Sequence, residues 1–192
     1  MESSEGVLRS VSAQREREVP GKRKLIRDRY LEKFKKQANP PVTRTAVNNE
    51  EYCLLLDEKL EEEAGEWMVS RDPMELADCL EVISAECETR TIKHTPFSLK
   101  KMQESDKELI GAIKSIINNG VTDMDIFNGM FLSQIEKWSK THNFKDLARI
   151  LGIVYAAGRL SVPETAIPQL EEKQRAKHVK LGGFSKRVVL EL

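Results

Sequence analysis

Apolar residues recur along this chain mainly at helical spacing, every three or four positions. No segment alternates cleanly between apolar and polar residues, as a strand with one buried face would. The pattern predicts an all-α fold, in which the helices form a bundle around one core. The expected helices span residues 24–37, 48–70, 73–89, 97–118, 123–140, 143–158 and 163–178, and an irregular tail follows over 179–192.

Residues that start helices support these bounds in the middle of the chain. Asn48 or Asn49 is suited to cap the second expected helix, because a short polar side chain accepts a hydrogen bond from the first turn. Asp72 and Pro73 are a capping residue and a first helical residue for the third. Since the link between these two helices is short, they are predicted to form an antiparallel hairpin.

The N-terminal segment 1–22 is polar and mixed in charge, and we expect a flexible arm before a single domain over 23–192. No stretch approaches the roughly 18 apolar residues of a membrane span, and the N-terminus has no apolar signal core. Neither a membrane partner nor secretion is therefore expected. Cys53, Cys79 and Cys87 lack CxxC spacing and are predicted to be buried free thiols of a cytoplasmic protein.

Charged residues are balanced in number but segregated along the chain. Lys and Arg total 31 and Asp and Glu total 31, so the formal net charge is zero. A neutral chain argues against a nucleic-acid polymer as partner, because generic nucleic-acid binders are basic. Between Glu50 and Glu88 there are fourteen acids and two bases, whereas between Arg15 and Lys36 there are ten bases and four acids. The acidic block coincides with the predicted hairpin.

Two acids of the first hairpin helix fall at or beside its apolar stripe. At about 100° per residue, that stripe consists of Tyr52, Leu56, Leu60 and Trp67. Glu63 falls in the middle of it and Glu66 beside it, whereas Glu61 points the opposite way. A charged carboxylate under an apolar face is costly unless it is paired or bound to a cation. Lys59, one turn earlier, is a possible partner for Glu63 but cannot neutralise the whole cluster.

The second hairpin helix adds Glu75 and Asp78, again three residues apart and away from its main core stripe. Across the hairpin the two carboxylate pairs can face each other, and gathered like charges repel. A hard divalent cation with oxygen ligands, Mg²⁺ or Mn²⁺, removes that conflict. The spacing predicts a metal site at Glu63, Glu66, Glu75 and Asp78. The alternative is a solvated acidic face, which is the expected role of Glu58, Glu61 and Glu88.

These segments, EKLEEEAGEW (58–67) and MELADCLEVISA (74–85), resemble the MazG-like all-α nucleoside triphosphate pyrophosphatases. The mark of that superfamily is E-x-x-E followed by E-x-x-D. The phosphoribosyl-ATP pyrophosphohydrolase-like branch is the most similar, because it opens with a K-L-V-R-D-K type motif, here KLIRDR (24–29). That branch ends in a basic G-G-F tail, matched here by Lys177, Lys180, Gly182, Gly183, Phe184, Lys186 and Arg187.

The resemblance implies a reaction in which a nucleotide is cleaved between its α and β phosphates into a monophosphate and pyrophosphate. It implies Mg²⁺ on the four carboxylates, with Mn²⁺ as a possible substitute, and Glu62 with Glu63 as the catalytic pair. Glu62 would orient or deprotonate the attacking water. Non-standard nucleotides and a phosphoribosyl-ATP-like compound are both substrates that the resemblance allows. The side chains expected to balance the phosphate charge are Lys59, Arg27, Lys177, Lys180 and Arg187. A solubilising tail is the alternative for the C-terminal bases.

The chain also resembles itself at an offset of 71 residues. ELADCLEVISA (75–85) aligns with DLARILGIVYA (146–156), and Trp67 aligns with Trp138. The four ligand positions become Gln134, Lys137, Asp146 and Arg149. If this is a degenerate repeat, a second hairpin over 123–158 completes a pseudo-dimeric core within one chain, with one metal site. The alternatives are a chance match of two helical hairpins and a homodimer of whole chains.

Two other functions stay open at this point. One is a non-catalytic relative that binds a nucleotide or a protein, although retention of all four acids favours activity. The other is a plain helical interaction protein, in which removing the buried acids would raise stability. The histidines His94, His142 and His178 show no ligand spacing and are expected to be structural or solvent-facing.

Overall fold

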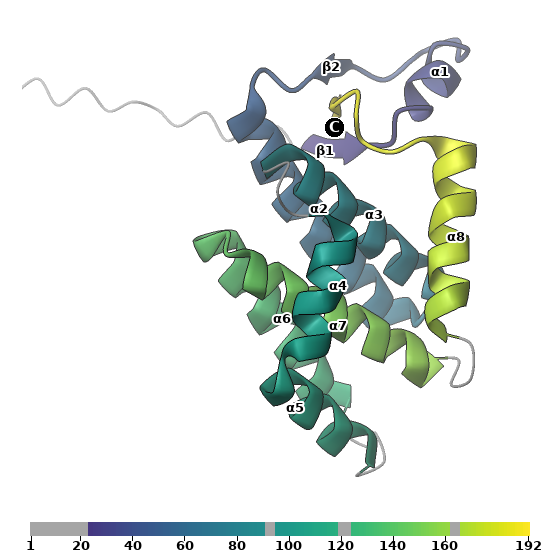
Figure 1. Cartoon of the computed structure of the whole chain (residues 1–192). Coiled ribbons are helices and arrows are strands. Elements are labelled where there is room, and N and C mark those ends of the chain that lie inside the picture. The colour runs from purple at the N-terminus through teal and green to yellow at the C-terminus, as the bar shows by residue number, and fades with distance from the viewer. Residues whose placement is uncertain (1–22, 91–94, 119–123, 162–165) are drawn as a thin grey trace, which may run out of the picture.

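In the part of the chain that this computed structural model describes, eight helices and a small three-stranded sheet make up the protein (Figure 1). The described residues are 23–90, 95–118, 124–161 and 166–192, so the predicted arm over 1–22 lies outside them. The predicted all-α bundle is confirmed. The elements are β1 (Arg23–Ile26), α1 (Tyr30–Phe34), β2 (Thr43–Thr45), α2 (Asn49–Ser70), α3 (Pro73–Arg90), α4 (Pro96–Ser105), α5 (Lys107–Asn118), α6 (Met124–Thr141), α7 (Phe144–Ser161), α8 (Ala166–Leu181) and β3 (Val188–Glu191).

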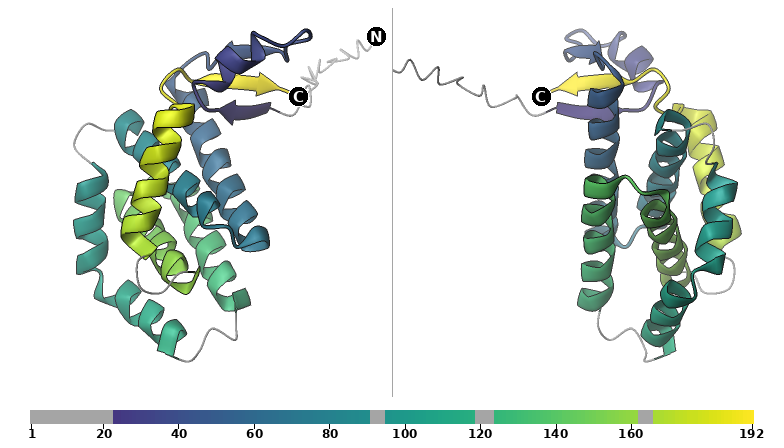
Figure 2. Two further views of the ribbon diagram at one scale, coloured as in Figure 1. Left: turned by 90° about the vertical axis from the view of Figure 1, so that its right-hand side faces the viewer. Right: turned by 60° about the vertical axis from the view of Figure 1, so that its left-hand side comes forward.

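Two antiparallel helical hairpins, α2–α3 and α6–α7, pack on each other to form the core. Helix α4 covers α7, and α8 runs along α3 and α7 before it leads back to the sheet (Figure 2). The sheet lies across one end of the bundle (Figure 1). The bulkiest side chains that are completely buried include Trp67, Trp138, Phe127 and Phe131. None of the helices in the described ranges is long and apolar enough to cross a membrane.

The two hairpins turn in the same way, 71 residues apart. Arg71 and His142 each end a helix in the left-handed backbone conformation, with φ of 58° and 47°. The backbone N–H of each donates to a tryptophan carbonyl four residues earlier, Trp67 and Trp138, over 2.8 Å in both cases. The predicted cap by Asp72 is present, because its side chain accepts from the N–H of Met74. The offset found in the sequence therefore relates two equivalent turns.

Two contacts between the hairpins are also related to each other by the offset of 71 residues. Arg71 donates to Asn128 over 3.2 Å, and His142 Nε2 lies 3.0 Å from Asp57 Oδ2. Positions 57 and 128 differ by 71, as do 71 and 142, so each contact is the counterpart of the other across a local two-fold axis. This self-complementary arrangement is the one that symmetric dimers use. The two hairpins of this chain therefore make equivalent contacts with each other.

A buried ionic junction lies beside this axis. Glu86 of α3 is fully buried and pairs with Arg90, which also donates to Asp57 over 2.9 Å. The guanidinium of Arg90 lies over the ring of Trp138, 5.2 Å from its centroid. Asp57 also contacts the imidazole of His142 in the second hairpin. One network of charges therefore joins α2, α3 and the turn between α6 and α7.

The first expected helix, over 24–37, is wrong for most of its length. Residues 23–26 form β1, which pairs antiparallel with β3, and only the five residues of α1 are helical. The expected irregular tail over 179–192 is wrong as well, because α8 continues to Leu181 and residues 188–191 form β3. Strands of four residues are too short to show periodicity, and their pairing joins the two ends of the chain.

Other boundaries differ less. The helix expected over 97–118 is two helices, α4 and α5, because the side chain of Asp106 accepts from Leu109 N–H and starts a new helix. Asn48, rather than Asn49, caps α2 by accepting from Glu51 N–H over 2.8 Å. The three cysteines are free; Cys79 and Cys87 are buried as predicted, whereas Cys53 is only half-buried.

Truncation of Phe131 should show how much the contact between the hairpins stabilises the fold. Phe131 is fully buried, and its ring lies 6.2 Å from that of Trp67, whereas the neighbouring Leu132 is 43% exposed. Phe131→Ala should lower the free energy of unfolding by about 3–5 kcal/mol because it leaves a cavity. Leu132→Ala should change it by less than about 1 kcal/mol. Chemical denaturation measures both, and equal losses would contradict this packing.

The ionic junction should make stability depend on pH. Burial raises the pKa of Glu86 to about 8 from an ordinary value of 4.5, against the opposing effect of Arg90. Folding therefore favours the protonated form, and the stability that Glu86 contributes is complete below pH 4.5 and lost as pH rises through 8. Between pH 5 and 8 the loss should be about 3–4 kcal/mol.

Denaturation at several pH values checks this with two glutamine variants. Glu86→Gln should flatten the decline, whereas Glu88→Gln, at an exposed position of the same helix, should keep it. A decline as steep in Glu86→Gln as in the native sequence would assign the pH dependence to other groups.

Candidate metal and phosphate site

Glu63 lies on the buried face of α2, where the helical spacing puts it, whereas Asp78 is buried although the spacing puts it away from the core stripe of α3. Glu63 is buried under the apolar side of α2, with 4% of its surface exposed, while Glu61 and Glu66 are exposed. On α3, Asp78 is buried and Glu75 is half-buried. Because α2 and α3 run antiparallel, these side chains from both helices can meet across the hairpin.

Their carboxylates gather around Glu63 as two overlapping groups. Oxygens of Glu63, Glu75 and Asp78 lie within 4.8 Å of one another, and so do oxygens of Glu62, Glu63 and Glu66. The four predicted ligands are therefore neighbours, with Glu62 as an additional carboxylate. A set of hard oxygen donors, part buried and part open to solvent, fits Mg²⁺ or Mn²⁺, which keep some water ligands.

The protonation of the cluster reflects its crowding. Burial, together with the charges of Asp78 and Glu66, raises the pKa of Glu63 to about 7, although Lys59 acts in the opposite direction. Burial raises the pKa of Glu66 too, and the charges of Glu62 and Glu75 add to that shift. These carboxylates disfavour one another's ionised forms, and a bound cation would relieve that repulsion.

Two cations from the chain ends reach Asp78. Arg27, directly after β1, donates to Asp78 Oδ1 over 2.5 Å and to the carbonyl of Gly182 over 3.0 Å. Lys177 of α8 pairs with the other oxygen of Asp78. The first basic motif and the C-terminal segment thus meet at one predicted ligand, which is where the resemblance implies phosphate-balancing charge.

Two further lysines form ion pairs with carboxylates of α2. Lys59 is buried and pairs with Glu63, and it lies 3.1 Å from Glu62. Lys24, which was not predicted as a site residue, pairs with Glu62 as well. Burial opposes ionisation, but the hydrogen bond from Lys24 and the charge of Lys59 outweigh it and hold the pKa of Glu62 below its ordinary range. The sequence signal for Lys24 is its position as the first residue of the KLIRDR motif.

The other two predicted phosphate-binding residues lie elsewhere. Lys180 is exposed near the end of α8 and does not line the cavity that contains the acids. Arg187 has a φ of 53° and lies over the ring of Tyr52, 4.8 Å from its centroid, while it donates to Asn49. Its contacts hold the start of α2 against the C-terminal strand.

The G-G-F tail closes over the hairpin through its backbone. Asp28 N–H donates to Gly183 carbonyl over 2.8 Å, and the Asp28 carboxylate accepts from Ser185 and from Lys186 N–H. Gly182 has a φ of +76°, and a side chain at Gly183 would come within 2.9 Å of a carboxylate oxygen of Glu81. The positive φ of Gly182 therefore favours glycine at the position whose carbonyl accepts from Arg27, whereas Gly183 packs closely against the flexible side chain of Glu81.

A cavity of about 410 Å³ contains the acid cluster and these cations. Its remaining walls are apolar and come from β1, α1 and the C-terminal segment. The residues that line it are Lys24, Leu25, Ile26, Arg27, Tyr30, Phe34, Lys59, Glu63, Glu66, Glu75, Asp78, Lys177, Leu181, Phe184 and Leu190.

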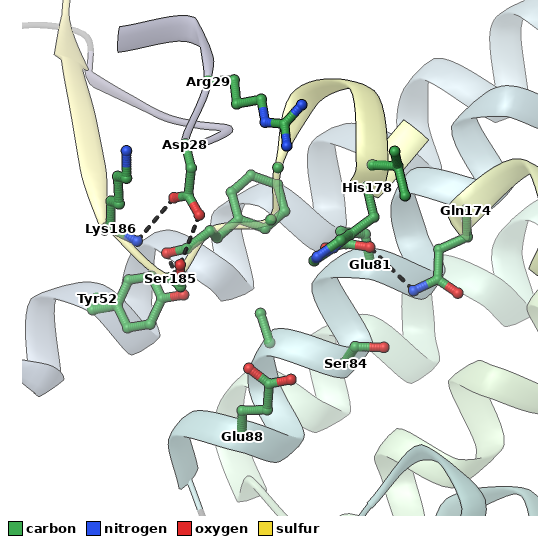
Figure 3. A pocket seen from close by; sticks show the side chains of 15 residues that line it. Asp28, Arg29, Tyr52, Glu81, Ser84, Glu88, Gln174, His178, Ser185 and Lys186 are labelled. Atoms are coloured by element: carbon green, nitrogen blue, oxygen red, sulfur yellow. Dashed lines mark hydrogen bonds and ion pairs between the residues drawn. The ribbon is translucent and has the colours of Figure 1, made fainter. Parts of the chain in front are cut away.

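A second cavity, of about 590 Å³, lies among α3, α8 and the G-G-F tail (Figure 3). Figure 3 shows His178 and Gln174 of α8 beside Glu81 of α3, and their nitrogens lie 2.7 and 3.1 Å from its carboxylate. Sequence reasoning assigned no role to His178 or Glu81. Although it is larger, this cavity does not contain the predicted ligands, so the acid cluster marks the stronger functional candidate.

In the second hairpin, cations occupy two of the four positions equivalent to the predicted ligands, Lys137 and Arg149. Lys137 pairs with Asp146 over 3.0 Å, and the Gln134 amide donates to the same carboxylate over 3.2 Å. Arg149 binds Asp106 and Glu108 of the preceding helices. No acidic cluster like that of α2 and α3 occurs on α6 or α7 among the residues that the structure describes. The ammonium group of Lys137 thus neutralises Asp146, the one acid among the four equivalent positions.

Metal binding should depend on Glu63 and on pH. Glu63→Gln should weaken Mn²⁺ binding at least tenfold, whereas Glu61→Gln, on the opposite face of α2, should leave it unchanged. Because a ligand carboxylate must lose its proton to bind a metal, and the pKa of Glu63 is about 7, affinity should rise roughly tenfold from pH 6 to pH 8. Titration followed by the electron paramagnetic resonance of free Mn²⁺ measures both effects; equal affinities for the two variants would exclude this site.

Comparison with known proteins adds no relative to this description. No family model matches the chain, no curated protein matches it, and no solved structure matches it. The similarity to the MazG-like pyrophosphatases therefore stays a prediction from the sequence motifs.

Proposed function

We propose that this chain is a metal-dependent nucleoside triphosphate pyrophosphohydrolase of the MazG-like type. The observation that carries the proposal is the composition of one cavity, where buried carboxylates suited to a divalent cation adjoin Arg27, Lys59 and Lys177. A metal–polyphosphate complex carries both positive and negative charge. The carboxylates would bind its metal ion, and the basic side chains would bind its phosphates. The cavity among α3, α8 and the G-G-F tail lacks the acid cluster.

Each side chain has a distinct task in the proposed reaction. A bound Mg²⁺, held by Glu63, Glu66, Glu75 and Asp78, would supply Lewis-acid stabilisation of the phosphate charge. Arg27 and Lys177, which pair with Asp78, would balance the charge of the phosphates.

Glu62 is the proposed general base. Its lowered pKa keeps it ionised near neutral pH, and it is half exposed beside Glu63. It accepts a proton from a water molecule whose oxygen bonds to phosphorus, while the anhydride bond between the α and β phosphates breaks. One nucleotide and one water thus give a nucleoside monophosphate and pyrophosphate.

The substrate class is the one that the resemblance to the MazG-like pyrophosphatases implies. Non-standard nucleoside triphosphates, removed before they are incorporated, and a phosphoribosyl-ATP-like compound both carry the required α–β anhydride bond. The free state of Cys53, Cys79 and Cys87 favours the reducing cytoplasm as its compartment.

Release of pyrophosphate from a panel of standard and non-standard nucleotides with Mg²⁺ tests this proposal. At least one nucleotide should be cleaved, and Glu63→Gln should abolish turnover along with metal binding. Glu62→Gln should lower kcat by about 10²- to 10⁴-fold, the usual contribution of a general base, and should leave Mn²⁺ affinity within a few-fold. Glu58→Gln, exposed on the same helix, is the matched control and should behave as the native sequence does.

Two outcomes would contradict hydrolysis in different ways. A rise in Tm with Mg²⁺ and nucleotide, without turnover of any of them, would indicate the non-catalytic nucleotide-binding relative. Neither turnover nor a rise in Tm, with Glu63→Gln indistinguishable from the native sequence, would leave only a structural role for the acids.

A further inference from the structure

One half of the cavity that contains the acid cluster is apolar, and the proposed metal and phosphate chemistry does not use it. The acids and bases occupy the walls formed by α2, α3 and Lys177, whereas the facing walls come from β1, α1 and the C-terminal segment. The apolar walls consist of Leu25, Ile26, Tyr30, Phe34, Leu181, Phe184 and Leu190. A free polyphosphate would leave this half in contact with water.

Two aromatic rings on α1 stand out within these walls. Tyr30 and Phe34 are four residues apart, so they lie on the same side of the helix. Their ring centroids are 6.0 Å apart and their planes are inclined by 34°. Both rings are only half-buried, whereas the core rings Trp67 and Phe127 are almost completely buried. No residue of α1 is fully buried, so these rings are not part of the core.

The start of α1 is fixed relative to the polar half of the cavity. Arg29 N–H donates to the Leu181 carbonyl over 2.9 Å, and Tyr30 N–H donates to the Arg27 carbonyl over 3.0 Å. The guanidinium of Arg27 in turn lies between Asp78 and the ring of Phe184, 5.3 Å from the centroid of that ring. The aromatic pair therefore follows three residues after the cation that binds a predicted metal ligand.

We infer that Tyr30 and Phe34 are the surface on which the base of the substrate stacks. The inference rests on the proposed function and specifies its substrate as a nucleotide with an aromatic base, rather than a free polyphosphate or a non-aromatic phosphate ester. Planar bases stack on aromatic side chains, and 410 Å³ lies within the usual range of small-molecule sites. Lys33, whose Nζ lies 4.7 Å from the Tyr30 ring centroid, adds a cation next to the same surface.

Stacking also predicts broad base selectivity. Every base has a π face, so a stacking surface accepts different bases with similar affinity unless hydrogen bonds distinguish them. The aromatic rings of this pair offer one such group, the Tyr30 hydroxyl. Discrimination among bases should therefore be weak compared with discrimination between a nucleotide and a base-free phosphate compound.

Binding of two probes in the presence of Mg²⁺ tests the inference by isothermal titration calorimetry. The first is α,β-methylene-ATP, which cannot be cleaved between the α and β phosphates, and the second is methylenediphosphonate, which has no base. Tyr30→Leu combined with Phe34→Leu keeps apolar side chains but removes both π faces. The variant should weaken α,β-methylene-ATP binding at least about fivefold, the lower end of stacking on one base. Its affinity for methylenediphosphonate should stay within twofold.

Two single substitutions serve as controls. Tyr30→Phe keeps the π face and should lose less affinity for α,β-methylene-ATP than the double variant does. Glu32→Gln, exposed on the same helix, should leave both affinities unchanged. A thermal unfolding curve of the double variant close to that of the native sequence excludes loss of the fold as the cause.

The results separate this inference from the proposed function. Unchanged affinity of the double variant for α,β-methylene-ATP overturns the stacking surface, and so does a parallel loss of affinity for methylenediphosphonate. If the native protein releases pyrophosphate from nucleotides while the double variant binds the analogue as tightly, only the stacking surface fails. If the native protein binds neither probe and cleaves no nucleotide, the proposed function fails as well.

Discussion

The antiparallel pairing of β1 with β3 is the interaction on which the candidate site depends. It joins two segments near opposite ends of the chain, with Leu25 opposite Val189. The contacts of Asp28 with the tail continue this closure and hold Arg27 beside the acidic hairpin. The acids alone are local features of α2 and α3, but they gain Arg27 and Lys177 only when both ends of the chain have returned to the bundle. Apart from the local pair of Lys59 with Glu63, charge compensation in this site is therefore a long-range property of the fold.

The two hairpins differ in how the charge at their equivalent positions is balanced. In the first, carboxylates remain and are balanced by cations from distant segments, an arrangement that leaves room for exchange with a ligand. In the second, Lys137 and Gln134 satisfy Asp146 from within the hairpin. A neutralised site of this kind needs no metal and no chain ends. The local two-fold relation is consequently kept in the turns and their contacts, while the acidic clusters found among the described residues lie on the first hairpin alone.

Local patterns in the sequence were sufficient for the hairpin but not for the sheet. The position of Glu63 under an apolar face follows from helical spacing alone, because side chains four residues apart share a face. The strands at 23–26 and 188–191 are too short for a periodic signal, and each is stabilised by a partner that is remote in sequence. That is why the helix expected over 24–37 was wrong.

The positions of the basic side chains follow the same rule. Lys59 is one helical turn from Glu63, so its pairing could be predicted from spacing. The motif containing Arg27 was recognised, but its contact with Asp78 requires the sheet and the tail. Lys180 and Arg187 have the same charge and lie in the same tail as Lys177, yet they point to solvent and to Tyr52. Charge and proximity in sequence therefore do not determine which basic side chain reaches the acid cluster.

The covalent link between the two hairpins affects how the protein behaves on dilution. A core made from two separate chains dissociates as the concentration falls, and its stability depends on the amount of protein present. Here the contacts of Arg71 with Asn128 and of His142 with Asp57 join parts of one chain, so they form at a fixed effective concentration. Dilution of the protein therefore leaves these contacts between the hairpins unchanged.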